Sequence, residues 1–324
     1  MALTLQQRLE RIRVRAEEVK YWRVREEVPV DHWSLDGSPI AIGAAWPSRQ
    51  GVHRFAATAE VPEHWPVEDT RLSLDLGGES IVTLSYPNRQ PESFGVDPYH
   101  RDLPVRHRQI AIAAESTARE PFGVPVRNPR LVRASLQWID GPVHQLYLLL
   151  RQVIEAVTTL GTHEVVPHLL AAAEACQRSL DWPSATQEYH SRMAPSPGQQ
   201  QIWELPPIDA APSALDQAQR ASVVAAFDAL TGTLRALRDR YPPEGKVLLT
   251  GHAHIDLCWL WPWDETRRKM RRTFSTALSL MAGSDAFRFN QSTAQFYATL
   301  EEDDPAMLEA IKARAATGQW EPNG

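Results

Sequence analysis

The spacing of apolar residues changes three times along the chain, and these changes constrain the fold more than any other feature. Residues 4 to about 21 carry apolar side chains at helical spacing. From about 28 to 140 the spacing becomes alternating, in short segments separated by Pro, Gly and Asp. Helical spacing returns at 141, and from 246 onward strand-like and helix-like segments follow one another. The chain is therefore predicted to be multidomain.

The first predicted domain, residues 1–140, combines a helix with a β-sandwich. Thr4 and Gln7 have the spacing of a capping box, which places the start of the helix. Gly77 and Gly78 separate two alternating runs and predict a β-hairpin. Short alternating strands between turn residues are typical of antiparallel sheets, so a jelly-roll-like sandwich is expected.

The second predicted domain, residues 141–245, is a helical region. Two helices are predicted from the strings PVHQLYLLLRQVIEAVTTLG and VVPHLLAAAEACQRSL. The segment 181–212 is rich in Pro, Ser and Gln and predicts a long loop. Ser213 is expected to cap a third helix that runs to about Tyr241, with Asp216 at the capping-box position.

The third predicted domain, residues 246–324, alternates strands with helices. Strands are predicted from KVLLTGHAHIDL, FRFNQS and QWEPNG, with one helix from about Asp264 to Met281 and another through 303–316. This order is the opening of a parallel, barrel-like α/β domain. Two units and a third strand cannot close a barrel, so the domain is predicted to be truncated, with an exposed apolar edge after residue 246.

Composition and charge narrow the function classes. A formal net charge of −6 argues against a partner such as nucleic acid or an anionic membrane. The N-terminus is charged throughout and the chain has no run of about 18 apolar residues, so neither a secretory signal nor a membrane span is expected. Two cysteines, Cys176 and Cys258, predict reduced thiols. Together these features predict a cytoplasmic protein.

The stretch VLLTGHAHIDLCWLWPW holds the densest candidate chemistry. His252, His254 and Asp256 occupy every second position, so in an extended chain their side chains point the same way. They would lie at the carboxyl end of a strand, where parallel α/β domains carry their sites. Imidazole and carboxylate are good zinc ligands, and a pair supplies half of a tetrahedral shell. Spacing alone leaves open the alternative that a backbone carbonyl satisfies the histidine.

The surrounding residues resemble a known family. The string TGHAHIDLCWLWPWDETRRKMRRTFSTALSLM is similar to the start of the catalytic domain of glycoside hydrolase family 38, the α-mannosidases, and most similar to its cytosolic type. FRFNQSTAQFYATLEEDDPAMLEAIKARAATGQWEP resembles the next two strand segments of that family. The similarity is close from 246 to 324. Looser similarity to the family's N-terminal sandwich covers LSLDLGGESIVTLSY, DPYHRDLPV and RASLQWIDGPVHQLY.

The resemblance implies roles for four residues. His254 and Asp256 match the family's metal ligands, and Trp259 matches a tryptophan that lines the site against the bound mannose. His252 is not a ligand in the family and is expected to orient its neighbours. The choice of Zn²⁺ rests on the family, since a site of nitrogen and oxygen ligands would also accept another divalent ion such as Co²⁺. Core packing is expected for the next two tryptophans.

The family cleaves terminal α-mannosides of glycans or oligosaccharides with retention of configuration, which requires a nucleophile and an acid/base carboxyl. In the family pattern both carboxyls, and the remaining zinc ligands, lie beyond the position of Gly324. Glu321 falls on the approach to the nucleophile strand, so no catalytic residue is assigned. The resemblance thus implies an N-terminal fragment of a longer enzyme that is inactive alone. The sequence does not decide whether the chain forms homo-oligomers.

Two other function classes compete with this interpretation. In a metal-dependent amidohydrolase-type barrel an H-x-H pair after the first strand binds the metal, which would make His252 and His254 the ligands. A non-catalytic carbohydrate-binding or assembly module is the third class.

Three further polar clusters are interpreted structurally. The basic run from Arg267 to Arg272 is expected to form the solvated face of a helix, with Met270 turned inward. The acids of Glu301–Pro305 fit the end of one helix and the start of the next. The cluster of Asp97, Tyr99, His100 and Arg101 favours a turn, and the alternatives are a sugar-binding surface or a contribution to the catalytic cleft from outside.

Overall fold

The structure is a computed structural model that describes residues 3–48, 51–183 and 215–323. The chain divides into two compact units, each assembled from two separate stretches. The first unit comprises Met1–Glu27 and Trp138–Lys246, and the second comprises Val28–Gln137 and Val247–Gly324. The candidate site lies within the second unit.

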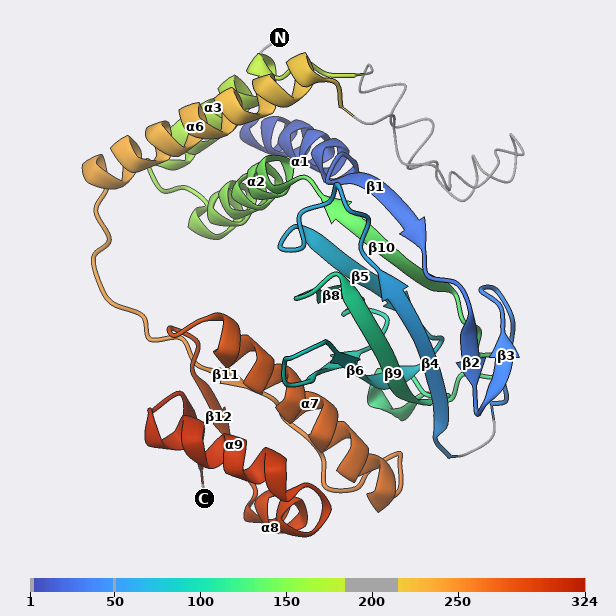
Figure 1. The fold of residues 1–324 in the computed structure, drawn as a ribbon. Coiled ribbons are helices and arrows are strands. Elements are labelled where there is room, and N and C mark those ends of the chain that lie inside the picture. Colours follow the sequence, from blue (N-terminus) through green and yellow to red (C-terminus); the bar gives the residue numbers. More distant parts are fainter. Residues whose placement is uncertain (1–2, 49–50, 184–214, 324) are drawn as a thin grey trace. The chain divides into compact units, whose positions relative to one another are not determined.

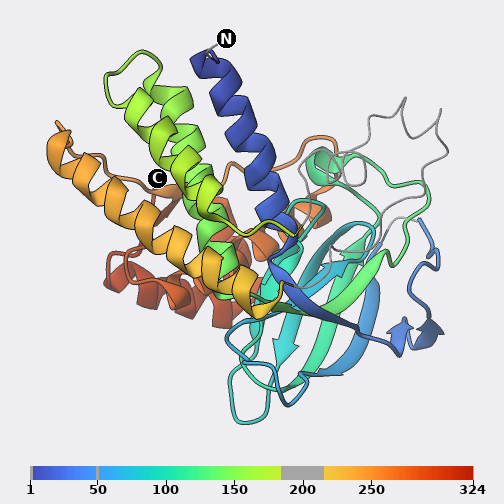
Figure 2. The same ribbon diagram turned by 90° about the horizontal axis from the view of Figure 1, so that it is seen from above.

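In the described residues of the first unit, four helices lie side by side in both views (Figures 1 and 2): α1 (Leu5–Tyr21), α2 (Gly141–Leu160), α3 (Val166–Ser179) and α6 (Gln217–Arg240). Their apolar stripes meet in one core, as amphipathic helices require. Residues from all four helices are buried in it, among them Ile12, Val19, Leu146, Leu150, Leu170, Ala173, Ala226 and Leu230. The helices predicted in residues 141–245 are present as α2, α3 and α6, and α1 packs against α2 and α3; the predicted division into domains stays a prediction.

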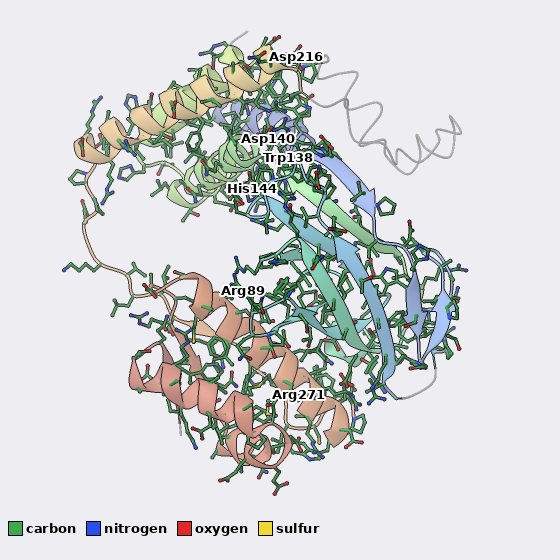
Figure 3. All side chains as sticks on the ribbon, viewed as in Figure 1. Arg89, Trp138, Asp140, His144, Asp216 and Arg271 are labelled. Carbon is green, nitrogen blue, oxygen red and sulfur yellow. The ribbon has the colours of Figure 1, made fainter. Side chains whose placement is uncertain are left out.

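Local capping signals set two helix starts. The capping box of Thr4 and Gln7 is confirmed, with both reciprocal hydrogen bonds present. The start predicted for the third helix is wrong, because Asp216 is itself the N-cap of α6 and forms the capping box with Gln219. Figure 3 labels Asp216 at this helix start and Asp140 at the start of α2. Ser213 and most of the predicted loop at 181–212 lie outside the described residues.

Two β-sheets precede the second helix. The four-stranded sheet has the order β1-β10-β5-β8, from β1 (Val24–Pro29), β10 (Arg133–Ile139), β5 (Thr70–Asp75) and β8 (Asp102–Pro104). The six-stranded sheet has the order β3-β2-β4-β9-β6-β7, from β3 (Ser38–Ile40), β2 (Trp33–Leu35), β4 (His53–Glu60), β9 (Gln109–Thr117), β6 (Glu79–Ser85) and β7 (Glu92–Val96). A short 3₁₀ turn, η1 (Pro121–Gly123), follows β9.

The six-stranded sheet is antiparallel throughout and buries one face. Buried and exposed residues alternate along β4 and β9, which is the pattern of strands with one solvated face. The antiparallel sheets predicted from the alternating segments are confirmed. The jelly-roll topology stays a prediction.

The predicted hairpin at Gly77 and Gly78 is wrong, because β5 and β6 belong to different sheets. The two glycines allow close backbone approach instead. A Cβ on Gly77 would lie 2.3 Å from the carbonyl oxygen of Arg130, and one on Gly78 would lie 2.1 Å from that of Thr117. The glycine pair thus marks a crossing between sheets rather than a two-residue turn.

The last part of the second unit is a three-stranded parallel sheet with helices between its strands (Figure 1). The order of elements is β11 (Gly251–His252), α7 (Trp263–Gly283), β12 (Phe289–Gln291), α8 (Ala294–Asp303), α9 (Pro305–Ala316) and β13 (Trp320–Pro322). The predicted alternation of strands and helices is confirmed. Closure into a barrel stays a prediction.

Two elements in this part differ from their predictions. The first strand is limited to Gly251–His252, because β12 offers hydrogen-bond partners only to these two residues. The preceding Val247, Leu248 and Leu249 are 82%, 97% and 85% exposed, which confirms the predicted apolar edge. The helix predicted through 303–316 begins at Pro305, where Asp304 caps it, and a separate α8 precedes it.

Both cysteines are unbridged, as predicted: Cys176 is buried and Cys258 is exposed. Burial raises the pKa of the Cys176 thiol to about 12. Among the described residues, no helix has the length and apolar content that crossing a membrane demands.

Candidate functional site

A pocket of about 720 Å³ lies in the second unit between the six-stranded sheet and the parallel sheet. One wall comes from strand β7 and the turn after it, through Gly95, Val96, Asp97 and His100. The other wall comes from the segment after β11 and from α7, through His254, Asp256, Trp259, Trp261, Lys269 and Arg272. The pocket falls within the range of about 300–1,000 Å³ that is usual for small-molecule sites.

His254 and Asp256 face each other at this pocket. The Nε2 atom of His254 lies 3.1 Å from Oδ1 of Asp256, and the two side chains are 79% and 36% exposed. Two ligands bound to one zinc ion at about 2.0–2.2 Å with a tetrahedral angle lie about 3.3–3.5 Å apart. The pair therefore fits one ion after a shift of a few tenths of an ångström. Within the described residues, no group of three or more His, Cys, Asp or Glu gathers as a metal site.

His252 faces a different partner. Its Nδ1 donates a hydrogen bond of 3.0 Å to the carbonyl oxygen of Asn290, since a carbonyl can only accept. Asn290 in turn donates from Nδ2 to the hydroxyl of Thr250 at 3.2 Å. These contacts tie the segment before the pair to β12.

The three tryptophans after the pair differ in burial. Trp259 is 58% exposed at the pocket, whereas Trp261 is 7% exposed and Trp263 is half-buried at the start of α7. Trp259 and Trp261 meet edge to face with ring centroids 5.9 Å apart. The core role expected for Trp261 is confirmed, and Trp263 is only partly buried. The ring of Trp259 is therefore exposed at the pocket, and its contact with mannose stays a prediction.

Thr266 fixes the backbone beside Asp256, and sequence reasoning missed it. Its side chain is fully buried, and its Oγ1 accepts a hydrogen bond of 3.0 Å from Nε1 of Trp261. The same hydroxyl donates to the carbonyl oxygen of Leu257 and lies 3.4 Å from that of Asp256. A threonine next to a run of basic residues carries no sequence signal for this role, because the carbonyls it binds belong to an irregular segment.

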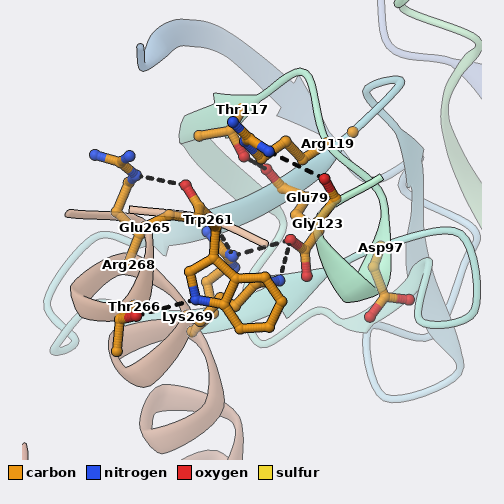
Figure 4. Close-up of polar contacts among 12 residues, drawn as sticks. Glu79, Asp97, Thr117, Arg119, Gly123, Trp261, Glu265, Thr266, Arg268 and Lys269 are labelled. Carbon is orange, nitrogen blue, oxygen red and sulfur yellow. Dashed lines mark hydrogen bonds and ion pairs between the residues drawn. The ribbon is translucent and has the colours of Figure 1, made fainter. Parts of the chain in front are cut away.

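A buried ion-pair network lies under the pocket (Figure 4). Glu79, on β6, accepts from Lys269 Nζ and from Arg272, whose Nη2 lies 3.2 Å from Oε2 of Glu79. Glu265 accepts from Arg272 at 2.8 Å and from Arg268 at 2.9 Å. Glu265 and Arg272 are 1% and 6% exposed.

The solvated face predicted for the basic run is wrong for Lys269 and Arg272, because both pair with a glutamate 190 or more residues away in sequence. Met270 is fully buried, as predicted. Lys269 also lies over the ring of Trp261, with Nζ 4.7 Å from the centroid. The network thus connects the first wall of the pocket to the second.

Burial and ion pairing shift the pKa of the Glu265 carboxyl in opposite directions. Desolvation alone would raise the pKa of its carboxyl, but the charges and hydrogen bonds of Arg272 and Arg268 outweigh it, so the pKa is lowered from 4.5. Glu265 is therefore ionised at neutral pH.

The acids of Glu301–Pro305 lie at the end of α8 and the start of α9, as predicted. Asp303, the last residue of α8, pairs with Arg267, with Nε 2.6 Å from Oδ2. Asp304 caps α9 by accepting from the backbone nitrogen of Met307 at 3.0 Å, and it lies 3.6 Å from Nε of Arg271.

Residues 97–100 form a turn, as predicted for this polar cluster. Oδ1 of Asp97 accepts from the backbone nitrogens of Tyr99 and His100 at 2.7 and 3.0 Å. Nδ1 of His100 lies 3.0 Å from Oδ2 of the same carboxylate. Asp97 and His100 both line the pocket, whereas Tyr99 is 80% exposed and is not part of the wall.

The part of the chain that forms the second wall of the pocket is similar to known proteins. Residues 244–324 match the sequence model of the Glycosyl hydrolases family 38 N-terminal domain. Alpha-mannosidase G of Dictyostelium discoideum is 44% identical over 81 residues, which make up 25% of this chain and 8% of that protein. Human Alpha-mannosidase 2C1 is 43% identical over 75 residues, 23% of this chain and 7% of that protein. Alpha-mannosidase of Saccharomyces cerevisiae is 41% identical over 61 residues, 19% of this chain and 6% of that protein.

The aligned part of the chain thus spans less than a tenth of the length of these relatives. The family resemblance predicted for residues from 246 onward is confirmed. The looser resemblance upstream stays a prediction, because the matches cover only the last quarter of the chain.

Proposed function

We propose, from the match of residues 244–324 to glycoside hydrolase family 38, that this protein acts as a zinc-dependent, retaining α-mannosidase on terminal α-mannosides of glycans or oligosaccharides. One observation carries the proposal. The His254–Asp256 pair stands at a pocket beside the exposed ring of Trp259, within the stretch that matches the family. The resemblance to the cytosolic type extends the proposal to a cytoplasmic location.

The zinc part of the proposal rests on the donor set. A neutral imidazole nitrogen and a carboxylate oxygen 3.1 Å apart fit two ligand positions of one zinc ion, and their exposure leaves the other positions open. A bound zinc would hold mannose hydroxyls and stabilise charge there. His254 and Asp256 would orient the ion, and Thr266 would hold the backbone that carries Asp256.

The two catalytic carboxyls are proposed to come from residues outside 1–324. Three carboxylates line the described pocket, and each already has a partner. Glu79 is paired with Lys269 and Arg272, Asp97 is bound within its turn, and Asp256 faces His254. A retaining glycosidase needs a nucleophile and an acid/base about 5 Å apart on either side of the bond. The 324-residue chain alone is therefore proposed to be inactive.

The amidohydrolase-type alternative would use His252 instead of Asp256. The contact from Nδ1 of His252 to the carbonyl of Asn290 engages one ring nitrogen with β12, whereas Nε2 of His254 faces a carboxylate. His254 and Asp256 line the pocket and His252 is not among its lining residues, which favours the mannosidase-type pair.

Activity measurements test the proposal. Residues 1–324, continued by the remainder of a family 38 catalytic domain that supplies the two carboxyls, are expected to release p-nitrophenol from p-nitrophenyl α-mannoside, and chelation of zinc should abolish the reaction. Asp256→Ala should lower kcat/KM by a hundred-fold or more, while Asp264→Ala, an exposed carboxylate on α7, serves as the matched control. Turnover by the 324-residue chain alone would refute the placement of the catalytic carboxyls.

A further inference from the structure

The sheet wall of the pocket is fastened to the helix wall by hydrogen bonds between β7 and α7. The backbone nitrogen of Gly95 donates to the hydroxyl of Thr276 at 2.9 Å, and the hydroxyl of Ser279 donates to the carbonyl of Ser93 at 3.1 Å. A Cβ on Gly95 would lie only 3.1 Å from Oγ1 of Thr276, so the strand and the helix are in close contact. The residues that follow Gly95 are consequently held at the pocket.

The Asp97–His100 turn comes directly after this contact and is preorganised. Two backbone N–H groups and the imidazole fix the Asp97 carboxylate, whose side chain is 24% exposed. The 74% exposed side chain of His100 donates from Nδ1 to that carboxylate, which leaves Nε2 of the neutral ring as an acceptor. In Figure 4, Asp97 and Trp261 lie on either side of the Glu79–Lys269 contact.

Across the pocket, the wall that carries the candidate metal ligands presents the exposed ring of Trp259. A flat apolar ring opposite polar acceptors suits a carbohydrate, whose ring has an apolar face and a rim of hydroxyls that donate and accept. A volume of about 720 Å³ lies in the upper part of the usual range for small-molecule sites, which accommodates more than one sugar ring.

We infer that Asp97 and His100 form a second sugar-binding subsite, which accepts hydroxyls of the sugar joined to the mannose at His254 and Asp256. This inference rests on the proposed function. It assigns to the β-sandwich a part in substrate choice: the turn favours a saccharide leaving group over an aryl one.

Kinetics on paired substrates test the subsite in the protein with a complete catalytic domain. Asp97→Asn keeps a side-chain oxygen that can accept from the backbone nitrogens of Tyr99 and His100, but it loses the negative charge and replaces the second oxygen by a donor. It is expected to lower kcat/KM for an α-mannobiose about ten-fold, mainly through KM, and to change kcat/KM for p-nitrophenyl α-mannoside less than three-fold. His100→Ala should act in the same direction. Asp102 is an exposed carboxylate on β8, so Asp102→Asn is the matched control and should leave kcat/KM unchanged for both substrates.

Equal losses on both substrates would overturn the inference, since they would mean that Asp97 holds the mannose itself or only supports the fold. Unchanged kinetics on both would overturn it as well. If the protein with its natural residues cleaves no α-mannoside, the proposed function is refuted. A binding experiment then tests whether Asp97 and His100 contact a sugar. Saturation-transfer NMR with α-mannobiose on the 324-residue chain should then show ring contacts that Asp97→Asn weakens and Asp102→Asn keeps; no contact, or equal contact in both variants, would overturn it.

Discussion

Two polar clusters lie close together in the second unit: the buried ion-pair network under the pocket and the His254–Asp256 pair at the pocket. They differ in burial and in how many of their polar groups have partners. Glu265 and Arg272 are almost completely buried, and each makes at least two ion-pair contacts with neighbouring side chains. His254 is exposed and Asp256 is partly exposed, and between them the structure shows a single side-chain contact of 3.1 Å. A buried network whose members satisfy one another stabilises the fold, whereas an exposed pair with open ligand positions is available to bind.

The largest expected effect comes from breaking the buried cluster. Glu265→Ala leaves Arg272 and Arg268 without this acceptor, and removing one partner of a buried pair costs about 3–5 kcal/mol of unfolding free energy. Hydrogen exchange of α7 amides in the 324-residue chain should report this loss. Glu301→Ala, an exposed acid on α8, should change exchange by less than about 0.5 kcal/mol. Similar protection in both variants would refute the structural role of the network.

Acid should weaken the same cluster in the unmodified chain. The folded pKa of Glu265 lies below 4.5, so its stabilising contribution is complete above pH 4.5 and is lost as the pH falls through the folded value. Protection of α7 amides is expected to fall in that acid window. In Glu265→Gln the part of the pH dependence that comes from this group should disappear; an unchanged profile would contradict the assignment.

A smaller loss of unfolding free energy is expected for a substitution of Thr266, which contacts the backbone that carries Asp256. Thr266→Val keeps the shape of the side chain but leaves Nε1 of Trp261 and the Leu257 carbonyl without their partner, at a cost of about 1–3 kcal/mol. Because Thr266 also holds the Asp256 backbone, zinc affinity should fall too. Thr317→Val, whose exposed hydroxyl binds a helix carbonyl, is the control that should leave both quantities unchanged. Normal zinc affinity in Thr266→Val would contradict the role of Thr266 in holding the metal ligand Asp256 and would leave it a role in stability alone.

The same contrast explains what the sequence could predict. Local signals were sufficient for the helix that Thr4 and Gln7 cap. Period-2 spacing grouped His252, His254 and Asp256 on one side of the chain, and only the family resemblance chose His254 and Asp256 among them. The partnership of Glu79 with Lys269 spans 190 residues, and no local pattern encodes it. The length of β11 likewise depends on how much of its edge β12 covers. Contacts between distant segments therefore produced the errors, both at the glycine pair and in the basic run.

Zinc binding by residues 1–324 continued by the remainder of a family 38 catalytic domain tests the central claim most directly. Titration with Zn²⁺ against a chromophoric chelator should detect one ion per chain, with affinity at least ten-fold lower in His254→Ala and in Asp256→Ala. His252→Ala should keep the affinity, because His252 is not among the residues that line the pocket with His254 and Asp256. Loss of zinc in His252→Ala with retention in Asp256→Ala would contradict the account and assign the ligands to the two histidines.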